Sequence, residues 1–183
     1  YQDLLRVSVA SAGNDHRLGA NEAPPAIVSV FLGTELTNIL EAIEKGKQYN
    51  PDAAALLKLS GDVIPALTKD NTDRNRTSPF AFTGNKFEFR MVGSQDSVAQ
   101  ANIVLNTIVA EAFSDACDIL EKADNFDLAV HDLIKDYAVE HQRIVFNGNG
   151  YSDEWVAEAE RRGLPNIKSM VDAICLLYTS PSP

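Results

Sequence analysis

The sequence predicts an α+β fold, because short segments with the period of a strand are combined with longer segments that have the period of a helix. Residues 5–9 and residues 86–92 alternate apolar and polar side chains, as half-buried strands do. Residues 96–123 and 126–143 instead repeat apolar side chains at helical spacing. The expected order is therefore strand, helices, strand and a helical C-terminal region.

Composition and charge fit a globular chain and oppose two classes of partner. The chain has 183 residues and a formal net charge of −10, and 45% of its residues are hydrophobic. This length fits about one domain, and this apolar fraction is enough for a buried core. Nucleic acids and anionic membrane surfaces need clustered Lys and Arg, which this acidic composition opposes. We expect a cytoplasmic protein with no nucleic-acid or membrane partner.

The first helices are expected between Pro24 and Gly46, where the apolar residues recur with a helical period. Two helical stretches are predicted there. Thr34 is a candidate N-cap of the second stretch, and Gly46 is a stop signal. Both signals place a helix directly before residue 46.

Residues 51–77 carry weaker patterns. Two short helical pieces are predicted, over 53–59 and 63–67, whereas residues 69–77 have no apolar period and are expected to form a loop. Together with the preceding helices, most of the stretch over residues 26–70 is thus predicted to be helical.

The C-terminal helical region is predicted to span residues 95–174. After its two long helices, Ser152 has the position of an N-cap, and the helix that follows should end at Gly163. The cations Arg161 and Arg162 fit a helix C-terminus better than a phosphate site. Residues 175–183 have neither charge nor amphipathic period and are expected to be a non-native tail; a natural Pro/Ser terminus is the alternative.

Three polar segments, residues 14–24, 73–79 and 86–90, each hold an arginine beside groups that can restrain it. A guanidinium is permanently charged and offers a planar set of donors to carboxylate or phosphate. Glu88 and Arg90 lie on the same face of the predicted strand, and Phe87 and Phe89 are expected to be buried on the other face. On the charged face a carboxylate can hold Mg²⁺ while the arginine contacts the oxygens that the metal bridges. A solvated strand face explains these two charges equally well.

Taken together and in order, three segments resemble the C-terminal half of the catalytic domain of glutamine synthetases, specifically of the long type III class. They are Arg17-Leu18-Gly19-Ala20-Asn21-Glu22-Ala23-Pro24, Asn75-Arg76-Thr77 and Glu88-Phe89-Arg90. The later segment Phe146-Asn147-Gly148-Asn149-Gly150-Tyr151-Ser152 is also similar to type III members. The resemblance covers about residues 1–174, so the expected fold is the C-terminal part of a glutamine synthetase-like catalytic domain, with a few antiparallel strands and C-terminal helices. It implies a catalytic region over residues 1–94, in which about residues 26–70 are a long helical insertion.

The resemblance implies a role for five residues. Arg17 would bind the carboxylate of glutamate, and Glu22 would be the flap carboxylate that closes the site and helps to deprotonate ammonium. Arg76 would contact the phosphates of ATP. Glu88 would be a ligand of Mg²⁺ or Mn²⁺, and Arg90 would stabilise the phosphoryl group in transit.

The same resemblance implies that the chain is a fragment of an ATP-dependent glutamate–ammonia ligase, which makes glutamine through γ-glutamyl phosphate. The intact enzyme would be a ring-shaped homo-oligomer, a dodecamer, and the fragment would be inactive alone. Two alternatives remain: a same-fold ligase or kinase for another amine or a guanidino substrate, and a non-catalytic acidic helical interaction module. Convergence of Arg17, Arg76, Glu88 and Arg90 on one cleft would favour the ligase.

Overall fold

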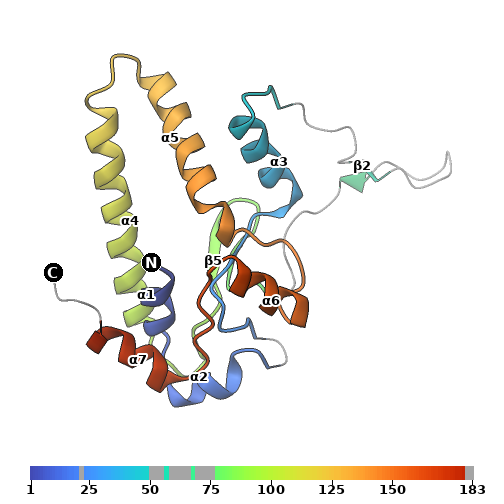
Figure 1. Cartoon of the computed structure of the whole chain (residues 1–183), viewed down its shortest axis with the longest axis vertical. Coiled ribbons are helices and arrows are strands. Elements are labelled where there is room, and N and C mark those ends of the chain that lie inside the picture. The colour runs from blue at the N-terminus through green and yellow to red at the C-terminus, as the bar shows by residue number, and fades with distance from the viewer. Residues whose placement is uncertain (21–22, 50–55, 58–66, 69–76, 180–183) are drawn as a thin grey trace.

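The computed structural model describes residues 1–20, 23–49, 56–57, 67–68 and 77–179. Within these ranges the fold is α+β, as expected, with helices arranged around a small central sheet (Figure 1). None of the described helices is long and apolar enough to cross a membrane.

The central sheet has three strands in the order β1-β4-β5. Strand β4 (Phe80–Phe82) pairs antiparallel with β5 (Phe87–Phe89) and parallel with β1 (Val30–Phe31). The sheet is therefore mixed, whereas only antiparallel strands were expected. Ala81 in the central strand is fully buried, so the sheet is anchored at its middle.

The N-terminal strand prediction is wrong. Residues 5–9 belong to a helical region instead, in which α1 (Gln2–Val7) is followed by α2 (Ala12–Arg17). Arg6, one of the polar residues of the alternation, has a buried side chain that donates a hydrogen bond from Nε to the carbonyl oxygen of Ile167. A contact 161 residues away in sequence thus overrides a pattern that is too short to decide between helix and strand.

Only one of the two helices predicted between Pro24 and Gly46 is present. It is α3 (Gly33–Glu44), and Thr34 lies inside it rather than at its N-cap. The apolar run at 23–28 is a buried extended segment, because a short apolar run fits a buried strand-like segment as well as a helix. The predicted stop at Gly46 is confirmed.

The next two described segments are short strands. Strand β2 (Leu56–Leu57) pairs antiparallel with β3 (Leu67–Thr68), so the helical pieces predicted over 53–59 and 63–67 are wrong at these residues. The rest of those pieces, and the loop predicted over 69–77 up to residue 76, lie outside the described residues.

The C-terminal helices agree with the sequence patterns. They are α4 (Ala99–Leu120), α5 (Phe126–His141), the 3₁₀ turn η2 (Gln142–Ile144), α6 (Asp153–Arg161) and α7 (Met170–Thr179). Helices α4 and α5 form an extended hairpin (Figure 1). The Ser152 hydroxyl accepts a hydrogen bond from the Trp155 backbone N–H at 3.1 Å, which confirms the predicted N-cap. Gly163 follows α6 with a φ of 68°, a left-handed conformation that favours glycine.

Helix α7 continues through residues 175–179, beyond the end predicted for the helical region. Residues 180–183 lie outside the described residues. The assignment of 175–183 to a non-native tail stays a prediction.

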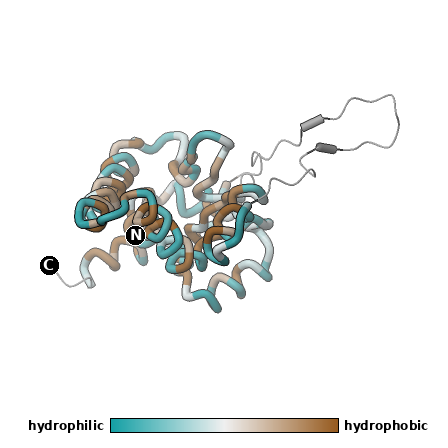
Figure 2. Tube along the Cα trace, turned by 90° about the horizontal axis from the view of Figure 1, so that it is seen from above, coloured by the Kyte–Doolittle hydropathy of each residue, from teal (hydrophilic) through white to brown (hydrophobic). Residues whose placement is uncertain are grey.

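Two apolar clusters flank the buried extended segment. Val28 belongs to one of them, and its neighbour Ile27 belongs to the other. The first cluster consists of Val9, Val28, Met91 and Ala101, and the second consists of Ile27, Trp155, Ala159 and Leu164. Hydrophobic and hydrophilic residues are interspersed along the helices (Figure 2), and the α4–α5 hairpin keeps large apolar side chains such as Phe113 exposed.

Candidate active site

Glu88 and Arg90 lie side by side at the end of β5. The Glu88 carboxylate oxygen Oε2 accepts hydrogen bonds from Arg90 Nη2 at 3.2 Å and from Arg90 Nε at 3.3 Å. Lys86 Nζ lies 3.6 Å from the other carboxylate oxygen. The predicted placement of both charges on one face is confirmed. The side chain of Arg90 is 18% exposed and that of Glu88 is 42% exposed, so both remain accessible to solvent.

The opposite face of β5 is less buried than expected. Phe87 is 46% exposed, so its predicted burial is wrong, while Phe89 is half-buried against the Val9–Met91 cluster. Strand β5 is at the edge of the sheet, and Phe87 is held there by stacking on Phe80 with ring centroids 5.4 Å apart.

Arg17 connects the first polar segment to the end of β5. Its Nη2 donates to the carbonyl oxygen of Arg90 at 3.0 Å, and its Nη1 donates to the carbonyl oxygen of Met91 at 2.9 Å. A third hydrogen bond, from Nη1 to the Asn14 side-chain oxygen, measures 3.0 Å. The structure thus joins Arg17 to the backbone at Arg90, while the Arg90 side chain pairs with Glu88. The backbone contacts of Arg17 were not predicted.

Asn14 is a member of this cluster that the sequence analysis did not assign. Its side chain is 1% exposed, and its Nδ2 donates to the carbonyl oxygens of Val9 and Met91, both at 2.8 Å. The available signal was its spacing from Arg17, since residues three apart on a helix share a face. That spacing alone does not identify the two carbonyl partners.

The predicted residues Glu22 and Arg76 lie outside the described residues. Two described residues near them in sequence, Pro25 and Thr77, meet at Gly150. A Cβ atom added to Gly150 would lie 2.6 Å from the Thr77 carbonyl oxygen and 3.4 Å from Pro25 Cδ. The loop before α6 therefore packs against Thr77 of the second polar segment and against Pro25, directly after the first, and only glycine fits there.

Glu88 has suitable chemistry for one ligand of Mg²⁺ or Mn²⁺, since both cations prefer carboxylate oxygens. Among the described residues no three His, Cys, Asp or Glu side chains form a group that could hold a metal ion. The described part of the chain therefore supplies a single candidate ligand rather than a complete metal site.

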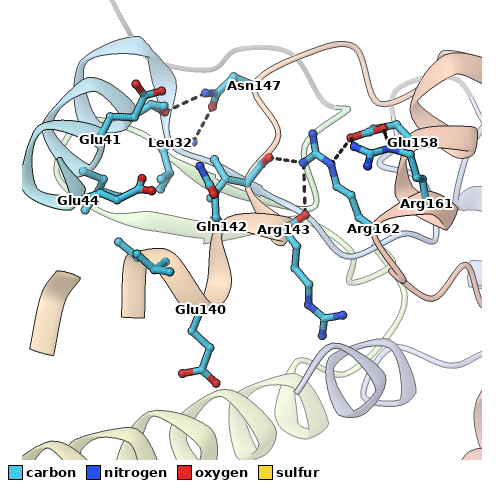
Figure 3. Close-up of a pocket in the computed structure, with 15 residues that line it drawn as sticks. Leu32, Glu41, Glu44, Glu140, Gln142, Arg143, Asn147, Glu158, Arg161 and Arg162 are labelled. Atoms are coloured by element: carbon cyan, nitrogen blue, oxygen red, sulfur yellow. Dashed lines mark hydrogen bonds and ion pairs between the residues drawn. The ribbon is translucent and has the colours of Figure 1, made fainter. Parts of the chain in front are cut away.

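A separate pocket of about 510 Å³ lies between α3, α5, η2 and α6 (Figure 3). Its lining does not include Arg17, Glu88 or Arg90. On one side Arg161 and Arg162 both bind the Glu158 carboxylate, at 2.7 and 2.6 Å. Hydrogen bonds from Arg161 and then Arg162 lower the pKa of Glu158 to about 2. Both arginines lie at the C-terminal end of α6, as the sequence suggested, whereas their pairing with Glu158 was not predicted.

Asn147, in the loop over residues 146–152, lies in the wall of this pocket and bonds to the start of α3. Asn147 Oδ1 accepts hydrogen bonds from the backbone N–H groups of Leu32 and Gly33, both at 3.0 Å (Figure 3). These bonds satisfy N–H groups at the start of α3, which explains why the helix does not use Thr34 as its cap. Phe146 stacks on Trp155 with ring centroids 3.7 Å apart.

Comparison with known proteins finds glutamine synthetases that match nearly the whole chain. Residues 129–182 match the family model described as the glutamine synthetase C-terminal domain. The chain is 50% identical over 177 residues to the type-3 glutamine synthetase of Dictyostelium discoideum, a match that covers 95% of the chain and 24% of that protein. It is 46% identical over 187 aligned residues to a glutamine synthetase of Butyrivibrio fibrisolvens, covering 97% of the chain and 25% of the relative.

A third relative is a glutamine synthetase of Bacteroides fragilis (strain YCH46), which is 47% identical over 180 residues. That match covers 94% of the chain and 25% of the relative. The chain thus spans about a quarter of the length of the curated relatives that it matches. With near-complete coverage of its own residues by three such relatives, the chain belongs to the glutamine synthetase family.

Proposed function

We propose that this chain forms part of an ATP-dependent glutamate–ammonia ligase that makes glutamine through γ-glutamyl phosphate. The observation that carries the proposal is the hydrogen bond from Arg17 Nη2 to the carbonyl oxygen of Arg90. It joins two motifs that are 73 residues apart in sequence. The membership in the glutamine synthetase family supports the same reaction.

Arg17 is proposed to bind glutamate. A guanidinium has five N–H groups, and the contacts with Asn14, Met91 and Arg90 use three of them among the described residues. Two N–H groups remain, which is the number that a bidentate contact with a carboxylate needs. Arg17 can therefore hold the strand and the substrate at the same time.

Glu88 and Arg90 are proposed to serve the phosphoryl transfer. A divalent cation, when bound, would neutralise charge on the phosphate oxygens, and Glu88 is the carboxylate of the described residues that would hold it. Arg90 is permanently charged and only partly exposed, so it is suited to stabilise negative charge that is spread over a phosphoryl group.

The reaction then proceeds in two steps. A γ-carboxylate oxygen of glutamate attacks the γ-phosphorus of ATP, and ADP leaves. Ammonia next attacks the carbonyl carbon of the acyl phosphate, and inorganic phosphate leaves. For the residues outside the described ranges, Glu22 is proposed to accept a proton from ammonium and to close the site, which protects the acyl phosphate from water. Arg76 is proposed to hold the phosphates of ATP.

The working enzyme is proposed to be a cytoplasmic, ring-shaped homo-oligomer, a dodecamer, and the chain alone is proposed to be inactive. Large exposed apolar side chains on the α4–α5 hairpin support an oligomer, because clustered exposed apolar surface is typical of protein contacts. The single candidate metal ligand supports the second proposal.

One alternative is a non-catalytic acidic module in which arginines only pair with surface carboxylates. The Glu88–Arg90 ion pair fits that alternative as well as it fits an enzyme. Arg17 has no carboxylate partner among the described residues; its partners are two backbone carbonyls and the buried side chain of Asn14. Membership in the glutamine synthetase family is what favours the ligase.

A chimera tests the proposal. Residues 1–179 replace the matching segment of the Bacteroides fragilis glutamine synthetase, and glutamine formation is measured with glutamate, ammonium, ATP and Mg²⁺ against the unaltered relative. Parallel reactions offer methylamine or a guanidino compound in place of ammonium, which tests the same-fold ligase or kinase. The expected result is ammonium-dependent glutamine formation that is lost in Glu88→Ala.

The matched control is Glu160→Ala, which removes an exposed glutamate from α6 and should leave the rate unchanged. An assembled chimera that makes no glutamine, or that prefers a guanidino acceptor, would overturn the proposed function.

A further inference from the structure

We propose that Asn14 is a positioning residue of this ligase, which sets the orientation of Arg17 and fixes the end of β5 that carries Arg90. The inference rests on the proposed function. Asn14 touches none of the proposed substrates, so its effect is transmitted through the two arginines.

The hydrogen bonds of Asn14 reach three separate segments. Its Nδ2 donates to Val9 and Met91, and its Oδ1 accepts from Arg17. Both donors and one acceptor of the carboxamide are thus used inside a nearly fully buried site. Because a buried polar group that loses its partners is costly, this arrangement has one favourable orientation.

The carbonyl oxygen of Met91 is the shared point of the network. It accepts from Asn14 Nδ2 at 2.8 Å and from Arg17 Nη1 at 2.9 Å. The side chain of Met91 is fully buried in the cluster with Val9, which fixes the same backbone from the other direction. Since Arg90 immediately precedes Met91, the position of the Arg90 side chain follows from this anchor.

Gly93 and Asp96, which follow Met91, pack around Asn14. A Cβ atom on Gly93 would lie 2.5 Å from Asp96 Oδ2 and 3.7 Å from Asn14 Oδ1. Ser11 accepts a hydrogen bond from the Asn14 backbone N–H and donates one to Asp96 Oδ2, at 3.2 and 3.1 Å. Helix α2 and the residues after β5 therefore form one connected unit around the asparagine.

Asparagine is the residue type that this position needs. An aspartate of the same shape has no N–H donor, so its carboxylate would face the carbonyl oxygens of Val9 and Met91. An alanine would leave both carbonyls and one Arg17 donor without this partner. The two substitutions therefore remove the same donors, and only aspartate keeps an acceptor for Arg17.

The test uses the chimera with Asn14→Ala, Arg17→Lys and the double variant. We expect Asn14→Ala to lower kcat/KM for glutamate by about tenfold or more, with the KM for ATP unchanged within about twofold. If Asn14 acts through Arg17, the same substitution in the Arg17→Lys background should cost less than about threefold. A role in stability alone would lower the amount of folded enzyme and leave these constants unchanged.

The matched control is Asn147→Ala. This asparagine also makes three side-chain hydrogen bonds, with Leu32, Gly33 and Thr37, but these lie on α3. We expect the control to keep the KM for glutamate of the chimera. An equal loss for Asn14→Ala in both Arg17 backgrounds would overturn the inference.

Hydrogen–deuterium exchange of the same variants tests, independently of activity, whether Asn14 fixes the end of β5. Asn14→Ala should speed exchange in the peptide over 88–96 and leave the peptide over 153–161 unchanged, whereas Asn147→Ala should leave both unchanged. Unchanged exchange over 88–96 would overturn the inference even in an active chimera. An inactive chimera with the expected exchange would overturn the proposed function and retain the positioning role of Asn14 toward β5.

Discussion

Arg17 Nη2 donates a hydrogen bond to the backbone carbonyl oxygen of Arg90 at a distance of 3.0 Å. One guanidinium is thereby shared between the backbone of a strand and the proposed carboxylate of glutamate. Arg17 and Arg90 cannot then move independently, which links the proposed substrate contact to the proposed phosphoryl contact.

Replacing Arg17 by Ala in the chimera should raise the KM for glutamate by about tenfold or more, because a charged hydrogen-bond donor to the substrate is lost. The KM for ATP should change little. Steady-state kinetics with each substrate varied in turn measures both constants. Arg143→Ala is the control, since Arg143 is exposed and its side chain donates a 3.4 Å hydrogen bond to the Gly163 carbonyl. Equal, small effects on both substrates would contradict the role of Arg17.

Replacing Glu88 by Ala should raise the Mg²⁺ concentration that gives half-maximal activity, because one carboxylate ligand is lost. Glu88→Gln keeps the size and one oxygen but removes the charge, and it should show the same direction of change. Activity measured against Mg²⁺ concentration at fixed ATP checks this outcome. An unchanged Mg²⁺ requirement in both variants would show that Glu88 is only the partner of Arg90.

Replacing Gly150 by Ala should lower the free energy of unfolding by about 1–3 kcal/mol, because the new Cβ would overlap the Thr77 carbonyl oxygen and the backbone must shift. Gly13→Ala in α2 is the matched control, since a Cβ there meets no atom within 4 Å. That change should be neutral or stabilising, as alanine favours helices. Urea denaturation of the parent, Gly150→Ala and Gly13→Ala measures the free energy of unfolding of each. Equal midpoints for Gly150→Ala and the parent would contradict the packing described.

The Glu158 carboxyl should titrate with a pKa of about 2 in the folded protein, below its ordinary value of 4.5, because Arg161 and then Arg162 stabilise the charged form. Because the pKa of Glu158 is lowered on folding, its charged form stabilises the fold at pH values above the ordinary pKa of 4.5. This contribution is lost as the pH falls from about 4.5 through 2. Carbon-13 NMR of the side-chain carboxyl follows the titration. Arg161→Gln should move the midpoint upward, and a midpoint near 4.5 in the parent would contradict the observed pairing.

The elements that the sequence predicted well are those with local signals. Helix α6 begins at the cap Ser152 and ends before Gly163, and both residues lie within a few positions of the groups that they satisfy. Helix α1 was missed because the burial of Arg6 depends on the carbonyl of Ile167. The start of α3 was misplaced because its N–H groups bond to the distant Asn147.

The candidate site likewise has one part that a local sequence pattern predicted and one part that it did not. The two-residue spacing of Glu88 and Arg90 on an alternating segment was enough to place both charges on one face. The network around Asn14 was not predictable, because its partners are backbone carbonyls of Val9 and Met91, and a carbonyl has no residue-specific signal in the sequence. Long-range backbone contacts of this kind require the folded chain.

The most direct test of the central claim is positional isotope exchange in ATP catalysed by the chimera. ATP is labelled with oxygen-18 in the β–γ bridge and is incubated with glutamate and Mg²⁺ but without ammonium. If Arg17, Glu88 and Arg90 serve reversible formation of γ-glutamyl phosphate, the label should move to a non-bridging β-oxygen. This exchange should require glutamate and should fall by about tenfold or more in Arg90→Ala. Exchange without glutamate, or the same exchange rate in Arg90→Ala as in the parent, would contradict the account.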